Sequence, residues 1–324
     1  MRTKFHAVRA LVLLLSLTIF TSRSNAQSII SGDGSLEVGL GFGPMFFLGD
    51  LGGTAGEGRP FVKDVDFPLT KISKTLFVSY YPSDFLGFRF AINHGVLEGD
   101  DAEAPNKGGA EVDRLKRNLH FKSSVLEAYV AAEIYPTVFF EQYDGLAKKL
   151  RPYGVIGAGM FKFNPKARDI NGEWVELKPL RLEGQGMAEY PNRKEYKLIQ
   201  MEIPMGFGAK YYLKENMYVG LEVLHRKLFT DYVDDVSTGY IEPSLFNAYL
   251  SPADAAVAQR LYYRGTYQGA QGQVNRPDDV LGYQRGDPTE NDAFFSTILK
   301  FGWRLNGNDP YSRSKRQMRC PVFY

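Results

Sequence analysis

Three sets of residues in this 324-residue chain are of types that carry chemistry, and the first is an acidic cluster. Asp231, Asp234 and Asp235 lie within the run TDYVDDVST. Carboxylates on a loop could serve an aspartyl-type outer-membrane protease or bind Ca²⁺ through hard oxygen ligands. The calcium-loop spacing D-x-D-x-D-G is absent, and capping of the loop by the Asp side chains is the alternative. Asp100 and Asp101 allow the same roles.

The second and third sets are histidines and glycines. His94, His120 and His225 lack the i, i+4 spacing of helical metal ligands, so positions on the surface or in the interior are expected. The run Gly39–Gly43 is similar to a phosphate loop, but it lies in an alternating segment with no helix after it. No Gly-x-Ser-x-Gly elbow is present. We therefore predict no catalytic residue, no cofactor, no metal and no enzymatic activity.

Composition indicates strands and turns. The chain holds 23 Phe, 20 Tyr and 33 Gly, residues that favour β-strands and tight turns. A net charge of +2 is too small to indicate nucleic-acid binding. The one cysteine, Cys320, excludes an internal disulfide and a zinc site made of cysteines.

The first 26 residues have the features of a secretory signal peptide. Basic residues precede the apolar run 10–20, and a small-residue site predicts cleavage between Ala26 and Gln27. An apolar run of 11 residues is shorter than the ~20 that a membrane-spanning helix needs. No later run is long enough either. We expect an exported protein that enters a membrane, if at all, as a closed barrel.

Apolar residues alternate with small or charged ones in eight segments of the mature chain. The segments are 36–42, 76–80, 86–93, 126–134, 153–163, 199–211, 217–224 and 295–304. An even number of such strands is typical of a bacterial outer-membrane barrel, although a soluble sandwich also alternates. We predict an all-β, eight-stranded antiparallel transmembrane β-barrel over residues 27–305, located in the cell outer membrane.

Connection lengths and aromatic residues favour the barrel over the sandwich. Short or moderate connections at 81–86, 136–150 and 213–216 alternate with long ones at 44–71, 98–118, 164–196 and 229–293. Short periplasmic turns and long extracellular loops are the outer-membrane pattern. Aromatic residues gather at both ends of the strands, so we expect two aromatic rings at the membrane interfaces.

The polar phase of the strands carries charges of both signs in equal number. They are Glu37, Glu127, Glu133, Glu202, Glu222, Arg89, Lys210, Arg226, Lys300 and Arg304. An eight-stranded barrel is just wide enough to be filled by its own side chains, and buried charges must be paired. We therefore predict a structural charge network that closes the lumen, with a relay or a selective pore as the alternative.

Residues 306–324 form a basic tail that the strand count places in the periplasm. Its candidates for binding a partner are Arg313, Lys315, Arg316, Arg319 and Cys320. An unstructured tail is the alternative. A lone cysteine in an exported chain is either a free thiol or an intermolecular link, so a disulfide from Cys320 to a periplasmic partner is one expectation.

Several short motifs, in order along the chain, carry a family resemblance. They are FLGDLGG (47–53), FVKD (61–64), RNL (117–119), FKFNPKA (161–167), GEW (172–174), EGQG (183–186) and TDYVDDVST (230–238). Together they resemble a Bacteroidetes outer-membrane β-barrel family that includes PorG of the type IX secretion system. The resemblance implies a non-enzymatic part of that apparatus, which ties a periplasmic ring of a lipoprotein and a soluble partner to the membrane.

Two other functions stay open at this point. A generic structural or adhesion barrel would act through its long external loops, and a loop-borne enzyme would use residues such as Asp231 or Asp235. The expected partners are outer-membrane lipid and the two ring proteins, with no nucleic acid.

Overall fold

Eight long strands dominate the computed structural model, which describes residues 35–51, 69–103, 111–139, 149–214, 216–265 and 281–305. The signal peptide and the basic tail lie outside these residues. The long strands are β1 (Ser35–Leu48), β2 (Lys71–Tyr81), β3 (Leu86–Asp100), β4 (His120–Ile134), β5 (Leu150–Lys162), β8 (Ile199–Lys214), β9 (Met217–Leu228) and β10 (Ala293–Arg304).

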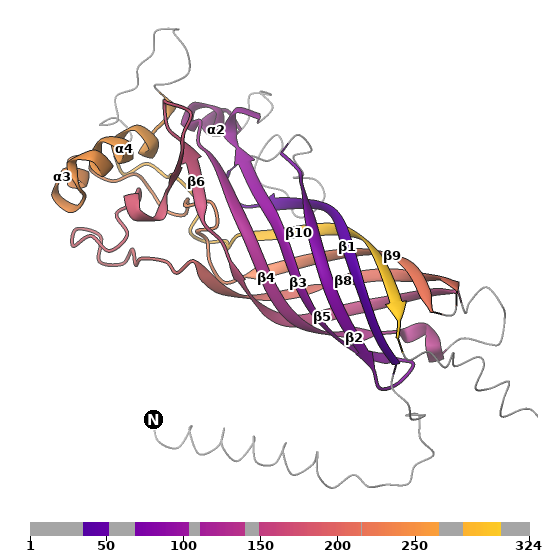
Figure 1. Cartoon of the computed structure of the whole chain (residues 1–324). Helices are drawn as coiled ribbons and strands as arrows, with labels where there is room; N and C mark the ends of the chain where they lie inside the picture. Colours follow the sequence, from indigo (N-terminus) through magenta and orange to yellow (C-terminus); the bar gives the residue numbers. More distant parts are fainter. Residues whose placement is uncertain are drawn as a thin grey trace, which may run out of the picture. The chain divides into compact units, whose positions relative to one another are not determined.

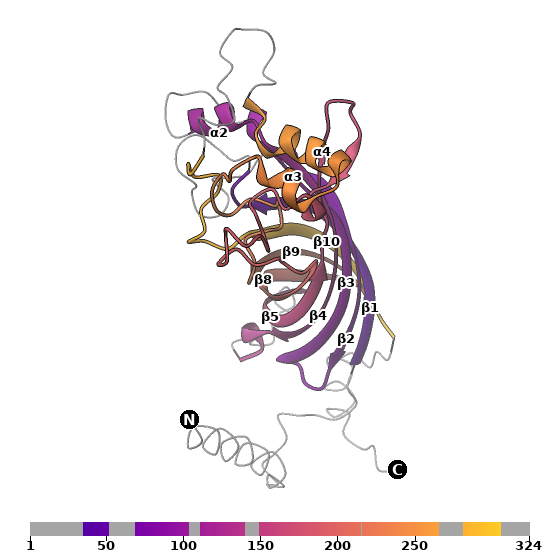
Figure 2. The same cartoon turned by 90° about the vertical axis from the view of Figure 1, so that its left-hand side faces the viewer.

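These strands close into an antiparallel barrel, which confirms the predicted fold class. Their order is β3-β2-β1-β10-β9-β8-β5-β4, and a further pairing of β3 with β4 closes the ring (Figures 1 and 2). The first and last strands pair along most of their length, with Glu37 opposite Arg304 and Phe47 opposite Phe294. The barrel therefore has no free edge to expose unpaired backbone groups.

The outer face of the barrel is apolar, as the alternation predicts. Leu76, Phe90, Val130, Phe207 and Leu221 are all exposed. In β2, β3 and β4 the residues that alternate with the exposed apolar ones point inward and are buried. A closed barrel with an exposed apolar surface is stable only where lipid covers it. The protein is therefore an outer-membrane barrel. No helix among the described residues is long and apolar enough to cross a membrane.

The long connections contain structure that the alternation could not predict. Their elements are η2 (Asp101–Glu103), α2 (Glu111–Arg117), β6 (Pro165–Arg168), β7 (Trp174–Glu176), η4 (Lys178–Leu180), α3 (Leu245–Tyr249) and α4 (Pro252–Tyr262), whereas η3 (Pro136–Phe139) follows β4 in a shorter connection. α2, α3, α4 and β6 lie at the same end of the barrel (Figure 1).

We use the name cap for residues 163–198 and 229–265 at this end. The cap has its own hydrophobic core, in which Leu182, Ile241 and Phe246 pack with residues of α4. β6 continues the barrel sheet upward by pairing with the outer part of β4, and β7 pairs with β6. The long connections thus fold onto the barrel end.

The predicted aromatic rings are only partly present. Tyr80, Tyr211 and Trp303 face outward at the short-turn end, as expected. Many of the others point inward, because the alternation places them in the polar phase. The inward aromatic residues are Tyr81, Tyr135, Tyr212 and Tyr218 at the short-turn end and Phe121, Phe161, Phe163 and Phe294 at the long-loop end. They fill the lumen and cannot mark a membrane interface.

The alternation of short and long connections predicts which end faces the medium. Asn192 in the cap and Asp84 in the β2–β3 turn are both exposed. In a Cys320→Ser background, a membrane-impermeant maleimide should label Asn192→Cys on intact cells. Asp84→Cys should be labelled only after lysis. The reverse labelling would invert the orientation.

Candidate functional site

The ten charged residues of the polar phase all project into the barrel. Nine of them are at most 1% exposed, and the side chain of Arg304, at the short-turn end, is 8% exposed. The structure divides them into two clusters along the lumen. Seven lie together near the short-turn end, and three lie nearer the cap.

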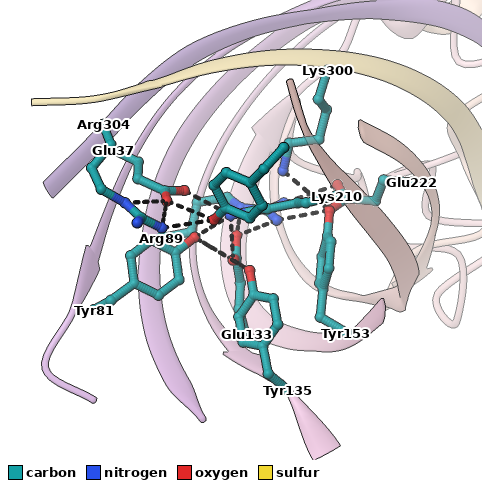
Figure 3. Close-up of polar contacts among 11 residues, drawn as sticks. Glu37, Tyr81, Arg89, Glu133, Tyr135, Tyr153, Lys210, Glu222, Lys300 and Arg304 are labelled. Carbon is teal, nitrogen blue, oxygen red and sulfur yellow. Dashed lines mark hydrogen bonds and ion pairs between the residues drawn. The ribbon is translucent and has the colours of Figure 1, made fainter. Parts of the chain in front are cut away.

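Arg89 on β3 is the central residue of the larger cluster. Its two terminal nitrogens donate to both oxygens of Glu222 at 2.9 and 2.7 Å, and its Nε donates to Glu133 at 2.6 Å. Glu133 and Glu222 come from β4 and β9, so one guanidinium joins three strands across the lumen (Figure 3). Bidentate pairing of this kind fixes geometry as well as charge.

Two lysines and a second arginine complete the larger cluster. Lys210 Nζ lies 2.8 Å from Glu37 and 3.2 Å from Glu133, and Lys300 Nζ lies 3.2 Å from Glu222. Arg304 pairs with Glu37 at 3.0 Å. The register of β1 and β10 places Arg304 opposite Glu37, which brings the pair together.

Four tyrosines supply the remaining hydrogen bonds of the carboxylates. Tyr153 donates to Glu222 at 2.6 Å, and Tyr81 and Tyr135 both donate to Glu133 at 2.5 Å. Tyr212 donates to Glu37 at 3.1 Å. Sequence reasoning counted only formal charges and therefore missed these hydroxyls. Their inward phase was visible in the alternation.

The smaller cluster centres on Arg226 and Glu127. Their side chains form a two-point contact at 2.5 and 3.1 Å, and Asn93 also donates to Glu127. Glu202 is the exception to the predicted pairing. It is 1% exposed, yet neither of its carboxyl oxygens has a hydrogen-bond partner among the described residues.

Apolar side chains close the lumen between the charge clusters and the cap. Phe121, Phe161, Phe163 and Phe294 pack there with Leu228 and neighbouring residues, all buried. Glycines on the inner face make room for rings nearer the short-turn end, since a Cβ at Gly39 would overlap Phe77 and one at Gly302 would overlap Tyr218. The glycines of the 39–43 run in β1 thus have a packing role in a narrow barrel.

A further polar cluster, outside the lumen, lies where the cap meets the ends of β1, β9 and β10. Asp50 follows β1, Asp231, Asp234 and Asp235 follow β9, and Asp292 immediately precedes β10. These strands are neighbours in the barrel, so the topology gathers the five carboxyls at one sector of the rim. We call them the cap carboxyls. The sequence motif contained three of the five.

Burial raises the pKa of all five cap carboxyls, and repulsion by other cap carboxyls raises it further for Asp231, Asp234 and Asp292. Burial raises the pKa of Asp231 to about 8, of Asp235 to about 7 and of Asp50 to about 6. It also raises the pKa values of Asp234 and Asp292 well above the usual range, and the other carboxyls add to the effect. Backbone N–H groups of Val236 and Val233 donate to Asp234 and Asp292 at 2.9 and 2.8 Å, respectively.

Glu183 belongs to the same region but is fully paired. It accepts hydrogen bonds from the backbone N–H groups of Ser237 and Thr238 and from the Thr238 hydroxyl, and it forms an ion pair with Arg285 at 2.9 Å. Glu183 therefore holds the TDYVDDVST segment in place. The loop-capping role that the sequence offered for the Asp side chains is seen at Asp234, which accepts a hydrogen bond from the backbone N–H of Val236.

The metal role finds no matching geometry in the described residues. No group of three Asp, Glu, His or Cys side chains there is placed to hold a metal ion. His94 contacts Ser124, and His120 accepts a hydrogen bond from the backbone of Arg168. Asp101 is paired with Arg117 at 2.8 Å.

The predicted partner-binding residues Arg313, Lys315, Arg316, Arg319 and Cys320 lie outside the described residues, as does the cleavage site at Ala26 and Gln27.

Comparisons with known proteins give weak likenesses. No family model and no curated protein matches the sequence. Among solved structures, the chain is similar to OprG of Pseudomonas aeruginosa, at 12% identity over 85% of this chain and 97% of the other, with a TM-score of 0.35. It is also similar to Ail of Yersinia pestis, at 8% identity over 84% of this chain and 97% of the other, with a TM-score of 0.34. A major outer membrane protein of Thermus thermophilus matches at 12% identity over 85% of this chain and 100% of the other, with a TM-score of 0.37. The barrel assignment above follows from the strand pairing alone.

The lumen network predicts a graded loss of stability. Arg89→Met leaves two buried carboxylates without their main partner and should cost about 3–5 kcal/mol. Arg304→Met should cost less, because Arg304 lies at the barrel end and is partly exposed. Glu202→Gln should match or exceed wild-type stability, since it removes a buried carboxyl that has no partner. Urea unfolding followed by heat-modifiable gel migration measures all three, and equal losses would refute the network.

The cap carboxyls predict that the cap loosens as the pH rises. A carboxyl with a raised folded pKa stabilises the folded form in acid, and this stability is lost from about pH 4 up to the folded value. Protease cleavage of the cap should therefore increase towards pH 8, where Asp231 loses its proton. Asp234→Asn should reduce this dependence. Glu183→Gln is the control, because it should loosen the cap at every pH, and a cap with no pH dependence would contradict the argument.

Proposed function

We propose that this protein is a non-enzymatic outer-membrane component of a type IX secretion apparatus, which anchors or assembles a periplasmic ring complex. The motif resemblance supports this assignment, and so does the filled lumen. A barrel whose interior charges pair with one another carries no open path for a substrate. Such a barrel acts through its ends and not through its interior, as a membrane anchor does.

The basic tail is the proposed contact with the ring. Residues 306–324 contain Arg313, Lys315, Arg316 and Arg319 but one acid, Asp309, and they follow the last strand on the proposed periplasmic side. A cationic segment attached to a fixed barrel suits an acidic surface on a ring lipoprotein or its soluble partner. Cys320 within the same tail could join that partner covalently.

The ordered cap favours a second candidate, an adhesion or structural barrel. The cap core and the Glu183–Arg285 pair hold the long loops in one arrangement. A preorganised external surface suits binding of an outside partner. The two candidates differ in which end of the barrel carries the function.

Crosslinking in native membranes distinguishes the two ends. We expect full-length protein to crosslink to the ring lipoprotein, and truncation after Leu305 to abolish the crosslink while the barrel stays heat-modifiable. On a non-reducing gel, a high-mass band should disappear with reductant and with Cys320→Ser. Replacement of the α3–α4 segment by a short linker is the matched control and should leave the crosslink intact. A crosslink that survives truncation, or one lost with the α3–α4 segment, would contradict the proposal.

A further inference from the structure

Basic side chains gather on the outer face of the barrel rim beside the cap. Lys122 of β4 lies opposite Lys166 of β6 in the strand register, and both are about 40% exposed. Arg168 of β6 lies opposite Trp174 of β7. Lys71, at the start of β2, joins the group through Glu98, which pairs with both Lys71 and Lys122. We use the name basic rim for these four basic residues and Trp174.

Two lysines directly opposite each other on neighbouring strands repel, which normally destabilises a sheet. The chain offsets this only partly. Glu98 pairs with both Lys71 and Lys122, at 2.8 and 3.0 Å, and Glu176 pairs with Lys166 at 3.1 Å. Three lysines thus share two carboxylates, and Arg168 adds a further cation, so the four basic side chains keep two positive charges over those carboxylates.

The indole of Trp174 joins the two halves of the basic rim. Lys122 Nζ lies 5.4 Å from its ring centroid and Arg168 Cζ lies 4.9 Å from it. The edge of His120 also packs against this ring. These contacts hold the cations in one patch, and tryptophan itself prefers the headgroup level of a membrane.

The position along β4 gives the depth of the patch. The outward residues of β4 from Leu126 to Ile134 are apolar or small, and Lys122 lies four residues before Leu126, towards the cap. At a strand rise of ~3.4 Å and a tilt of ~40°, eight residues cover about 21 Å along the membrane normal, close to the apolar band of such barrels. Four more residues place Lys122 about 10 Å beyond Leu126, outside the apolar band of ~25 Å and at the level of lipid headgroups.

We propose that the basic rim binds the phosphate groups of a phosphorylated glycolipid in the outer leaflet of the outer membrane. Lysine and arginine donate charge-assisted hydrogen bonds to phosphate oxygens, and the surplus positive charge needs a fixed anion. The surface faces sideways into the bilayer because Lys122 continues the outward phase of β4, and Lys166 of β6 lies opposite it on the same face. A lipid therefore reaches it more readily than a soluble ligand would. This inference is independent of the secretion role and depends only on the cap end facing outward.

The test uses purified full-length protein in detergent, titrated with fluorescent lipopolysaccharide. Replacing both lysines with Lys122→Gln and Lys166→Gln should weaken binding about 30-fold, which corresponds to about 2 kcal/mol at ~1 kcal/mol for each charge near a membrane surface. Lipopolysaccharide stripped of its phosphates should bind wild type as weakly as the intact lipid binds the double variant. Raised salt should weaken only the wild-type interaction.

The matched control replaces two exposed lysines at the opposite end, Lys149→Gln and Lys214→Gln, and should leave the affinity unchanged. Heat-modifiable migration verifies that every variant is folded. Equal binding of the phosphate-free lipid, or an equal loss in the control pair, would overturn the proposal. Displacement by phosphatidylglycerol or by inorganic phosphate at the same concentration would overturn the glycolipid as the ligand. Failure here would leave the ring crosslink of the basic tail unaffected.

Discussion

Inside an eight-stranded barrel there is little room for water, so each charged side chain that points inward must find its partner on another strand. Arg89 meets this constraint by contacting Glu133 and Glu222, and Lys210 meets it by contacting Glu37 and Glu133. Apart from the contact between Arg89 and Glu133, on the consecutive strands β3 and β4, each contact links strands that are distant in sequence. The pairing therefore selects one register and one closure of the barrel, because a shift by one residue would place these charges in lipid.

The same constraint shapes the rest of the lumen. The cluster near the short-turn end holds four bases and three acids, and the one nearer the cap holds one base, Arg226, and two acids. The buried tyrosine hydroxyls supply donors to the carboxylates, and apolar rings seal the lumen above. Glu202 is where the pairing is incomplete, and its position beside the Arg226–Glu127 pair marks the weakest part of the network.

Strand number, strand phase and the inward position of all ten charges could be predicted from the sequence, because a period of two is set locally by the backbone. The sequence could not predict which charges pair with each other, since partners such as Lys210 and Glu37 are 173 residues apart. The prediction of two aromatic rings fails in part for a related reason. Position near a strand end does not by itself indicate the membrane interface, and the phase of Tyr81 and Phe121 places both side chains inside the barrel.

The loops show where periodicity stops being informative. β6 and β7 are strands of four and three residues, too short for alternation to identify, and α3 and α4 cover a core that exists only once the cap has folded. The cap carboxyls show the same limit, because Asp50 and Asp292 are distant in sequence from the TDYVDDVST motif. They join it only because β1, β10 and β9 are neighbours in the closed barrel. Because side chains fill the lumen, a partner cannot enter the barrel from the cap end. The rim and the cap are therefore the surfaces through which the cap end of the protein can make contacts.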